Sequence, residues 1–584
     1  MVYAGAVAMR SLFRTLLRDG GSTPRLAGHP RRRHHGGDAS PARTHFQPGI
    51  QPSRMLHEAD YVIVGAGTAG CVLANRLTDD PRTRVVLVEA GGANRHPLSR
   101  IPAGFLRLLD HPKLSWQLRT EPEAATGDRA ILFPRGKGLG GSSAINGLLY
   151  VRPLAGDLDH WAQLGNRGWS FADTLAYFRR SESWEGGGDE WRGGEGPLRI
   201  ARLLDPPELC EAIVAAGVAQ GLAYRDDANA PSDASTIFLY QQTRKGRLRA
   251  SAATAFLQPA LRRPNLRVLA QSHVRRVLLE GHRAVGVEIE RGGRTETVRA
   301  ARETVLAGGV IGSPHVLQLS GIGDPDDLAP LGIPVAHALP GVGKNFQDHY
   351  VVRLTYRIKD IATINERVRG LGMLRELAAF ALRGRGVLTY SAALVGAYVQ
   401  TSLRSSGPDV QYVIAPASFR AGVLGALEAE GGLSCGCWQM RPLSRGSVTA
   451  RSADPRVPPR IRPGFLKEQA DCDAVVAGLR FGRKLVHSDP LGRYVAAETL
   501  PGKEAESDAA LLDYARRNGS TVYHAVGTCR MGDDAGAVVD SELRVRGLDA
   551  LRVIDGSIMP AITSTNTNAT VLMIAEKGAD LLRA

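Results

Sequence analysis

The first clear pattern in the chain is a short apolar run that leads into a glycine turn. Residues 60–64 are mostly apolar and β-branched, residues 65–70 carry three glycines, and apolar side chains then recur at helical spacing. This order predicts a strand, a tight turn and a helix. In such a unit Gly65 permits the turn, Gly67 lets a pyrophosphate approach the backbone, and Gly70 lets helix and strand pack closely. The candidate cofactor contacts here are Gly65, Gly67, Thr68, Ala69 and Gly70.

A second apolar run, residues 84–89, predicts the next strand, and it ends in an acid. Glu89 lies nineteen residues beyond Gly70, where a carboxylate can accept hydrogen bonds from an adenosine ribose. The N-terminus of the intervening helix offers N–H donors and partial positive charge to phosphates. The unit therefore predicts dinucleotide binding, although it does not separate FAD from NAD.

Further apolar runs extend the same alternation of strands and helices. Residues 265–269, 274–279 and 284–289 predict short strands between turn residues, and 304–309 predict a buried strand that enters a glycine turn. Residues 212–219 predict part of a helix of a soluble domain. No stretch of 18 or more apolar residues occurs, so no membrane-spanning helix is predicted. The expected fold class is α/β.

A second glycine-rich segment, residues 136–147, is too dense in glycine for a helix or a strand. Its glycines would allow backbone contact with a flat ligand, and its hydroxyl and amide groups could bind phosphate, ribityl or ring atoms. A plain flexible loop is the alternative. The candidate contacts are Gly138, Gly140, Ser142, Ser143, Asn146 and Gly147.

Near the C-terminus, His524 lies among small residues, and histidine is the side chain best suited to exchange a proton near neutral pH. From the spacing alone, a structural hydrogen-bonding histidine is the alternative.

Four segments together resemble the glucose–methanol–choline (GMC) family of FAD-dependent oxidoreductases. They are residues 136–159, 309–323, 339–349 and 441–446, and the similarity extends from about residue 58 to 580. The resemblance implies a Rossmann-like FAD-binding domain assembled from discontinuous segments and a substrate-binding domain with a sheet covered by helices. We expect residues 55–165, 245–345 and 515–584 in the first domain, and residues 166–244 and 346–514 in the second.

The resemblance also implies roles for residues of the site. His524 would face the reactive edge of the flavin and act as the catalytic base, and Asn566, eleven positions before Lys577, would be the second polar catalytic residue. Asn568 is the fallback and could instead bind the flavin. Either asparagine could simply cap the helix that follows. The cofactor contacts implied are Val274 near the adenine, together with Asp555 and Gly556.

The reaction implied is oxidation of an alcohol to an aldehyde, with a proton taken by His524 and a hydride passed to flavin N5. An electron acceptor, either oxygen, a quinone or a carrier protein, would then reoxidise the flavin. Some relatives attach FAD covalently through a histidine where Ile145 stands here, so non-covalent FAD is expected. Choline-oxidising relatives carry a glutamate that aligns loosely with Leu394, which favours a neutral primary alcohol over a cationic substrate.

Two alternatives within the family are a choline dehydrogenase and a non-oxidative flavoprotein such as a fatty-acid photodecarboxylase. The photodecarboxylases lack the catalytic histidine and carry a cysteine before an Arg-Pro pair. This chain has His524, and Met440 precedes its Arg441-Pro442.

The net charge of +15 is concentrated at one end of the chain. Residues 1–54 contain nine arginines and two acids, and residues 10–18 show a small cationic amphipathic pattern. This leader could be a mitochondrial presequence or a peripheral membrane contact, or translation could begin at Met55; otherwise we expect a cytoplasmic protein. With only 6% aromatic residues, the chain does not favour a nucleic-acid partner. Six scattered cysteines predict neither a disulfide framework nor a metal site.

Overall fold

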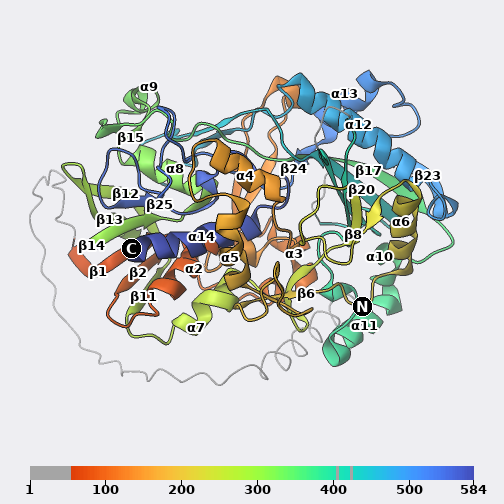
Figure 1. The fold of residues 1–584 in the computed structure, drawn as a ribbon, viewed down its shortest axis with the longest axis horizontal. Helices are drawn as coiled ribbons and strands as arrows, with labels where there is room; N and C mark the ends of the chain where they lie inside the picture. Colours follow the sequence, from red (N-terminus) through yellow and green to blue (C-terminus); the bar gives the residue numbers. More distant parts are fainter. Residues whose placement is uncertain (1–53, 403–406, 421–424) are drawn as a thin grey trace, which may run out of the picture. The chain divides into compact units, whose positions relative to one another are not determined.

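Two large mixed β-sheets organise residues 54–402, 407–420 and 425–584, the part of the chain that the computed structural model describes. Residues 55–584 form one compact unit. In Figure 1 the first sheet lies to the left and the second to the right, with helix α14 (Asn568–Arg583) running from the first sheet toward the centre. The basic leader and its amphipathic pattern lie outside the described residues.

The first sheet has seven strands and contains the predicted nucleotide-binding unit. Its order is β11 (Leu266–Ala270), β2 (Val85–Glu89), β1 (Arg54–Val64), β14 (Arg294–Leu306), β13 (Arg283–Arg291) and β12 (Ser272–Glu280), with β25 (Leu551–Val553) paired to β14. β11, β2 and β1 run parallel, whereas β12, β13 and β14 are antiparallel neighbours. β2 is buried along its whole length, as a nearly continuous Val/Leu run in a covered sheet should be.

Helices α2 (Thr68–Leu77) and α14 pack on this sheet beside each other. The close approach of α2 to the turn depends on Gly70, because a Cβ there would lie 1.9 Å from the carbonyl oxygen of Gly65. Helix α8 (Gly309–Leu319) follows β14 through a second glycine turn. The alternation of strand and helix confirms the α/β class.

The strands predicted from apolar runs are all present, with shifted ends. β11, β12 and β13 are one to three residues longer or displaced, but β14 begins at Arg294, ten residues before the predicted start. The part of β14 that was not predicted consists mainly of polar residues, with a few apolar ones between them, and pairs with β13 through Thr297 and Val298. Because an antiparallel strand can leave one face in water, this half lacks the apolar run that marks the buried end.

The second sheet has eight strands and a separate apolar cluster. Its order is β23 (Val495–Leu500), β17 (Tyr350–Ile358), β20 (Gly432–Gln439), β19 (Val410–Ala415), β18 (Val395–Val399), β8 (Thr236–Leu239) and β7 (Ala223–Tyr224), with β24 (Ser520–Thr521) paired to β17. Its central pairs, from β17 to β8, are antiparallel.

Three helices cover one face of this sheet: α6 (Glu208–Ala219), α12 (Gln469–Val486) and α13 (Asp508–Asn518). α12 approaches closely because two of its residues are glycines one turn apart. A Cβ at Gly478 would lie 3.1 Å from Cys437 Sγ, and one at Gly482 would lie 3.0 Å from a Leu354 methyl. α6 contains the predicted apolar segment 212–219, and the sheet covered by helices is as expected.

The remaining strands and helices lie outside the two large sheets. The strands are β3 (Ser115–Arg119), β4 (Leu132–Gly136), β5 (Glu182–Trp184), β6 (Leu198–Ala201), β9 (Gln242–Lys245), β10 (Leu248–Arg249), β15 (Ile322–Gly323), β16 (His337–Ala338), β21 (Ser447–Thr449) and β22 (Arg460–Arg462). The helices are α3 (Phe105–Leu108), α4 (Ala155–Gln163), α5 (Phe171–Ser181), α7 (Gln258–Ala260), α9 (Pro325–Leu328), α10 (Ile364–Arg367) and α11 (Gly370–Ala378).

All six cysteines are buried and carry free thiols, and Cys435 and Cys437 lie on the face of β20 that α12 covers. Within the described ranges, none of the helices combines the length and apolarity needed to cross a membrane.

Candidate active site

A cavity of about 1010 Å³ extends from the carboxyl ends of the first sheet to the uncovered face of the second. On one side it is bordered by the turns that follow β1, β2 and β14, which is where open α/β sheets bind nucleotides. On the other side alternate residues of β17, β19 and β20 face it. The sequence-predicted residues that border it are Gly65, Gly67, Thr68, Ala69, Glu89, Ser142, Asn146, Gly147, Val274, His524, Asp555, Gly556, Asn566 and Asn568.

Four residues proposed as cofactor contacts do not border the cavity: Gly70, Gly138, Gly140 and Ser143. Gly138 and Gly140 adopt left-handed backbone conformations that shape the loop. The Ser143 hydroxyl donates to the carbonyl oxygen of Gly140 and accepts from the amide of Ala252. These four residues support the wall of the cavity, and it is their neighbours in the sequence that border it.

Glu89 fastens the two glycine-rich segments to each other. Its Oε2 accepts the N–H of Ala66 at 2.9 Å, and its Oε1 accepts the N–H groups of Gly91 and Gly138 at 2.7 and 3.0 Å. A carboxylate that accepts three charge-assisted bonds is a strong anchor for backbone. The ribose contact predicted for Glu89 would use the acceptor capacity that these bonds leave, so it stays a prediction.

Asp555 likewise fixes backbone, at the turn where α8 begins. Its Oδ2 accepts from the Gly309 amide and the Ser313 hydroxyl, and its Oδ1 accepts from the Ser557 amide. Burial raises the pKa of Asp555, while these hydrogen bonds favour the ionised form.

Two helix N-termini meet at the cavity. The Thr68 hydroxyl at the start of α2 donates to Asn568 Oδ1 at the start of α14, at 2.9 Å. α14 begins after Thr567 without a side-chain cap, so capping does not account for Asn566 or Asn568. The arrangement aims two sets of free helix N–H groups and their partial positive charge into one space.

The reacting end is a chain of three side chains with a defined direction. His349 Nε2 lies 2.9 Å from the carbonyl oxygen of Met440, so Nε2 carries the proton and Nδ1 is left as an acceptor. His524 Nδ1 lies 3.0 Å from that acceptor and must donate to it. His524 Nε2 therefore keeps its lone pair, and Asn566 Nδ2 donates to it at 3.0 Å.

The same environment keeps His524 neutral. Burial lowers the pKa of His524 well below its usual value, and His349 and Arg135 lower it further. Burial also lowers the pKa of His349 to about 4. A neutral imidazole with a free Nε2 lone pair can act as a base at physiological pH.

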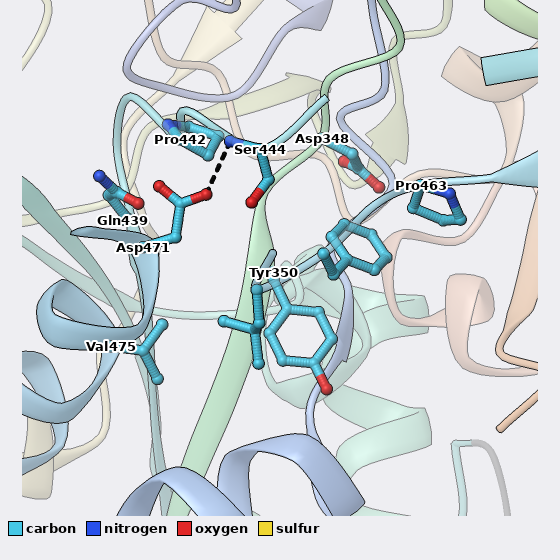
Figure 2. Close-up of a pocket in the computed structure, with 10 residues that line it drawn as sticks. Asp348, Tyr350, Gln439, Pro442, Ser444, Pro463, Asp471 and Val475 are labelled. Carbon is cyan, nitrogen blue, oxygen red and sulfur yellow. Dashed lines mark hydrogen bonds between the residues drawn. The ribbon is translucent and has the colours of Figure 1, made fainter. Parts of the chain in front are cut away.

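Asp348 holds the two histidines at this separation without bordering the large cavity. Its Oδ1 accepts the backbone N–H of both His349 and His524, and its Oδ2 accepts from the Thr521 hydroxyl. Burial raises the pKa of Asp348 to about 6. Figure 2 shows its side chain at the edge of a small cavity of about 20 Å³, opposite Asp471, which accepts the Ser444 N–H.

Three side chains of this end were not identified from the sequence. Besides His349, they are Trp438, whose ring centroid lies 5.8 Å from that of His524, and Gln411, whose Nε2 donates to Asn566 Oδ1 and Tyr240 Oη. His349 ends one of the family-like segments, which was the available signal. Gln411 and Trp438 lie on β19 and β20, and their spacing in the sequence carries no motif.

Leu394 does not face the substrate space, so using its apolarity against a cationic substrate was wrong. Its side chain is 1% exposed, belongs to the apolar cluster of the second sheet and does not border the cavity, whereas Ala392 and Ala393 do. Its apolarity reflects packing and says nothing about the substrate. Ile145 does border the cavity, within the glycine-rich loop.

A glycine-built cavity with two helix N-termini at one end and a poised base at the other defines an oxidoreductase that uses a dinucleotide cofactor. Family models described as GMC oxidoreductase match residues 59–351 and 442–575. The chain belongs to the GMC oxidoreductase family, it is FAD-dependent, and the resemblance seen in the sequence is confirmed.

Individual relatives agree. An uncharacterized GMC-type oxidoreductase of Mycobacterium tuberculosis is 39% identical over 537 residues, which is 91% of this chain and 100% of that protein. An oxygen-dependent choline dehydrogenase of Escherichia coli is 38% identical over 539 residues, covering 90% of this chain and 94% of the relative. The crystal structure of pyridoxine 4-oxidase from Mesorbium loti superposes with a TM-score of 0.82 at 31% identity, over 89% and 98% of the two chains.

The cavity fits FAD on its own evidence. Three backbone segments border it, at Gly65, Gly141 and Gly309, and each adopts a left-handed conformation that favours glycine. A Cβ at Gly141 would lie 2.7 Å from Gly67 Cα, so the first turn and the loop touch directly. The backbone can therefore lie against a pyrophosphate and a ring without intervening side chains.

Proposed function

We propose that this protein oxidises an alcohol to an aldehyde, with His524 as the catalytic base. The observation that carries the proposal is the ordered chain from Met440 through His349 and His524 to Asn566. It leaves one basic lone pair, on His524 Nε2, at the surface of the cavity. The amide donor of Asn566 lies beside it.

The two residues divide the work on the substrate hydroxyl. The alcohol O–H donates to His524 Nε2, and Asn566 Nδ2–H donates to the same oxygen, so the bond that now joins these two residues is replaced by two bonds to the substrate. As the proton moves to Nε2, negative charge on oxygen is stabilised by the amide donor. The His524 Nδ1–H bond to His349 holds the imidazolium. FAD, when bound, supplies the hydride acceptor at N5.

We assign FAD binding to residues 55–165, 245–345 and 515–584, and substrate binding to residues 166–244 and 346–514. Gly67, Thr68, Ser142, Asn146, Gly147 and Asn568, which border the cavity, support the first assignment. We further propose that FAD is held without a covalent bond, because Ile145 offers no nucleophile. Acid precipitation should then leave the yellow colour in the supernatant, and colour in the pellet would contradict this.

The test is anaerobic mixing of the purified holoenzyme with a panel of primary alcohols while the flavin absorbance is followed. Bleaching by at least one alcohol, with the aldehyde found in equal amount, is expected. No bleaching by any alcohol would sink the proposal. Readmitting air, a quinone or a carrier protein to the bleached enzyme then identifies the electron acceptor from the rate at which colour returns.

Choline oxidation is the second candidate, because relatives at 38–39% identity are named oxygen-dependent choline dehydrogenases. A quaternary ammonium group favours carboxylates or aromatic faces. Among the described residues, the carboxylates that border the cavity are Glu89 and Asp555, and both already accept backbone N–H groups. Trp438 and Tyr523 offer aromatic faces beside His524, but without a free carboxylate there we expect choline to reduce the flavin less well than a neutral alcohol.

A fatty-acid photodecarboxylase remains the non-oxidative candidate. His524 with its ordered partners argues against it. Cleavage of a fatty acid under blue light, with alcohols inert in the dark, would favour that activity instead.

A further inference from the structure

The inner face of the second sheet carries a cation next to the reacting end. Arg353 of β17 pairs with Gly436 of β20, and Trp438, which packs against His524, lies two residues further along β20. Two residues of a strand span about 7 Å. Arg353 therefore lies one row of side chains away from the reacting groups.

The Arg353 side chain leans over the sheet into the cavity. Its Cγ lies 3.3 Å from where a Cβ on Gly436 would be, so the missing side chain of Gly436 is what makes room for the arginine stem. Its side chain remains accessible because it borders the cavity. The surrounding protein nevertheless lowers the pKa of its guanidinium.

Arg353 has no anion of its own. In the described part of the chain its guanidinium makes neither an ion pair nor a side-chain hydrogen bond, and the titratable side chains that act on its pKa are the phenols of Tyr523 and Tyr514. Tyr514 Oη donates to the backbone carbonyl of Arg353. Tyr523 directly precedes His524, borders the cavity and has a left-handed backbone at φ 69°, a conformation that a bulky residue adopts only under constraint.

Burial raises the pKa of the Tyr523 phenol, which keeps its proton, and the charged groups that act on it are Arg353, Asp348 and Arg135. Its hydroxyl makes no hydrogen bond within the described ranges, although the Tyr523 carbonyl accepts from Arg135 Nη1 at 2.8 Å. A guanidinium and a phenol O–H, both unpaired and both facing one cavity, are complementary to a carboxylate.

The charged side chains that border the cavity carry a net positive charge. Five arginines border it: Arg119, Arg135, Arg353, Arg420 and Arg456. The carboxylates that border it are Glu89 and Asp555, both at the cofactor end, and behind its wall Asp454 pairs with Arg456 and Asp348 lies near Arg135. Such a surplus attracts anions into the cavity.

We propose that Arg353 and the Tyr523 hydroxyl bind a carboxylate carried by the substrate, so that the alcohol oxidised is a hydroxy acid. This substrate class rests on the proposed alcohol oxidation at His524. One row of side chains, about 7 Å along the sheet, separates the backbone of Arg353 from that of Trp438 beside His524, so we expect a short ω-hydroxy acid or a hydroxymethyl-substituted aromatic acid.

The experiment compares carboxylic acids with their uncharged amides of similar shape, and includes choline as a cationic alcohol. Holoenzyme is mixed anaerobically with 4-(hydroxymethyl)benzoate, its amide 4-(hydroxymethyl)benzamide and choline, and with 5-hydroxypentanoate and its amide. We expect each carboxylate to reduce the flavin with a KM at least tenfold below that of its amide, as one charge-assisted contact allows. Equal KM values for acid and amide would overturn the proposal while leaving alcohol oxidation in place.

Variants separate Arg353 from the general charge of the cavity. Arg353→Met should raise the KM for the carboxylates by about 30-fold, with the amides changed less than threefold. Arg353→Lys should recover most of the loss, which a purely structural role would not predict. Arg357→Met is the matched control, because Arg357 lies on the same strand but pairs with Glu430 outside the cavity.

A binding measurement keeps this test independent of turnover. 4-Methylbenzoate has no hydroxyl to oxidise, so its binding is read from the shift it causes in the flavin spectrum of the holoenzyme. Saturable binding to the wild type that Arg353→Met abolishes supports the carboxylate site even if no alcohol is oxidised. Equal binding by both proteins, each with full FAD content, would show that the site does not exist.

Discussion

The two ends of the cavity are built in opposite ways. At the cofactor end the side chains that matter, Glu89 and Asp555, are charged, and they point at the protein's own backbone amides. At the reacting end Asp348 also accepts backbone N–H groups, but the side chains that border the cavity and would meet the substrate hydroxyl, His524 and Asn566, are neutral and point at each other and into the open space. Binding FAD is thus a property of shaped backbone, whereas reacting with a substrate is a property of aligned side chains.

This difference sets how each end should fail. Damage to a carboxylate that holds backbone should release the cofactor, because the turns lose their relative position. Damage to the histidine chain should leave the cofactor bound and slow the chemistry. Each experiment below measures FAD content and the anaerobic rate of flavin reduction on the same sample.

The largest effect is expected from His524→Gln. A general base contributes about 10²- to 10⁴-fold, and a glutamine amide can accept a hydrogen bond but cannot take the proton, so flavin reduction should slow about 1000-fold with FAD content unchanged. The control is His487→Gln, an exposed histidine at the end of α12. Loss of FAD from the His524 variant would mean that this histidine is structural, and the contrast between the two ends would collapse.

Glu89→Gln should have the opposite result from His524→Gln, because it should weaken FAD binding and not the chemistry at the reacting end. The amide offers a donor where the carboxylate accepted three backbone N–H groups, so at least one buried donor loses its partner at a cost of about 1–3 kcal/mol. We expect the dissociation constant for FAD to rise about 30- to 100-fold, measured by titrating apoprotein with FAD. Glu280→Gln, on the outer strand β12 where Glu280 meets Arg299, is the control. Unchanged affinity would show that the Glu89 bonds do not hold the cradle.

The two ends also differ in how far the sequence predicted them. The cofactor end lies in contiguous segments, so the glycine turn at residues 65–70, the loop at 136–147 and the acid at the end of β2 were predicted from local spacing and lie where expected. What the sequence could not show was which glycines face the cavity: Gly70 and Gly140 pack against backbone and alanine instead.

The reacting end comes from the residue before β17, from β19 and β20, and from the segments after β24 and before α14, so that His349 and Asn566 are 217 residues apart. His524 and Asn566 were predicted only through the family resemblance. Gln411 and Trp438 were missed, because contact between strands depends on register, and a single sequence does not contain it. The error at Leu394 has a related origin, since the sequence alone does not show which side chains in the segment before β18 face the cavity.

His349 tests whether side-chain direction, and not bulk, controls the base. His349→Leu removes the acceptor of His524 Nδ1–H, so the tautomer is no longer fixed, and flavin reduction should slow about 30-fold. His349→Asn can place an oxygen near the former Nδ1 and should recover part of the rate. Equal rates for both variants would reduce His349 to a packing residue.

The pH dependence of flavin reduction gives a smaller effect with a defined sign. Protonation removes the base, so the rate must fall as the pH falls, but only below the lowered pKa of His524. An imidazole with the ordinary value near 6.5 would already lose about three quarters of the rate at pH 6. We expect the rate constant, measured with a saturating alcohol, to show no decline centred near pH 6.5; a loss near pH 6 that Asp348→Asn removes would come from Asp348, whose pKa burial raises to about 6. A decline centred near pH 6.5 would contradict the buried, neutral base.

Gln411→Met should have the smallest effect on flavin reduction, and its division between the rate constant and KM is informative. Gln411 donates to Asn566 Oδ1 at 3.3 Å, a long bond, while Asn566 keeps its closer contact with His524. Losing it should slow flavin reduction about threefold, near the net value of one neutral hydrogen bond of about 0.5–1.5 kcal/mol. The loss should appear in the rate constant and not in KM, because Gln411 orients a residue that acts on the developing alkoxide. Gln439→Met is the control, since Gln439 lies on the adjacent strand and borders the small cavity behind Asp348. Equal effects of the two variants would mean that the sheet transmits any disturbance to the base, and that the reacting end is held by packing as much as by its hydrogen-bond chain.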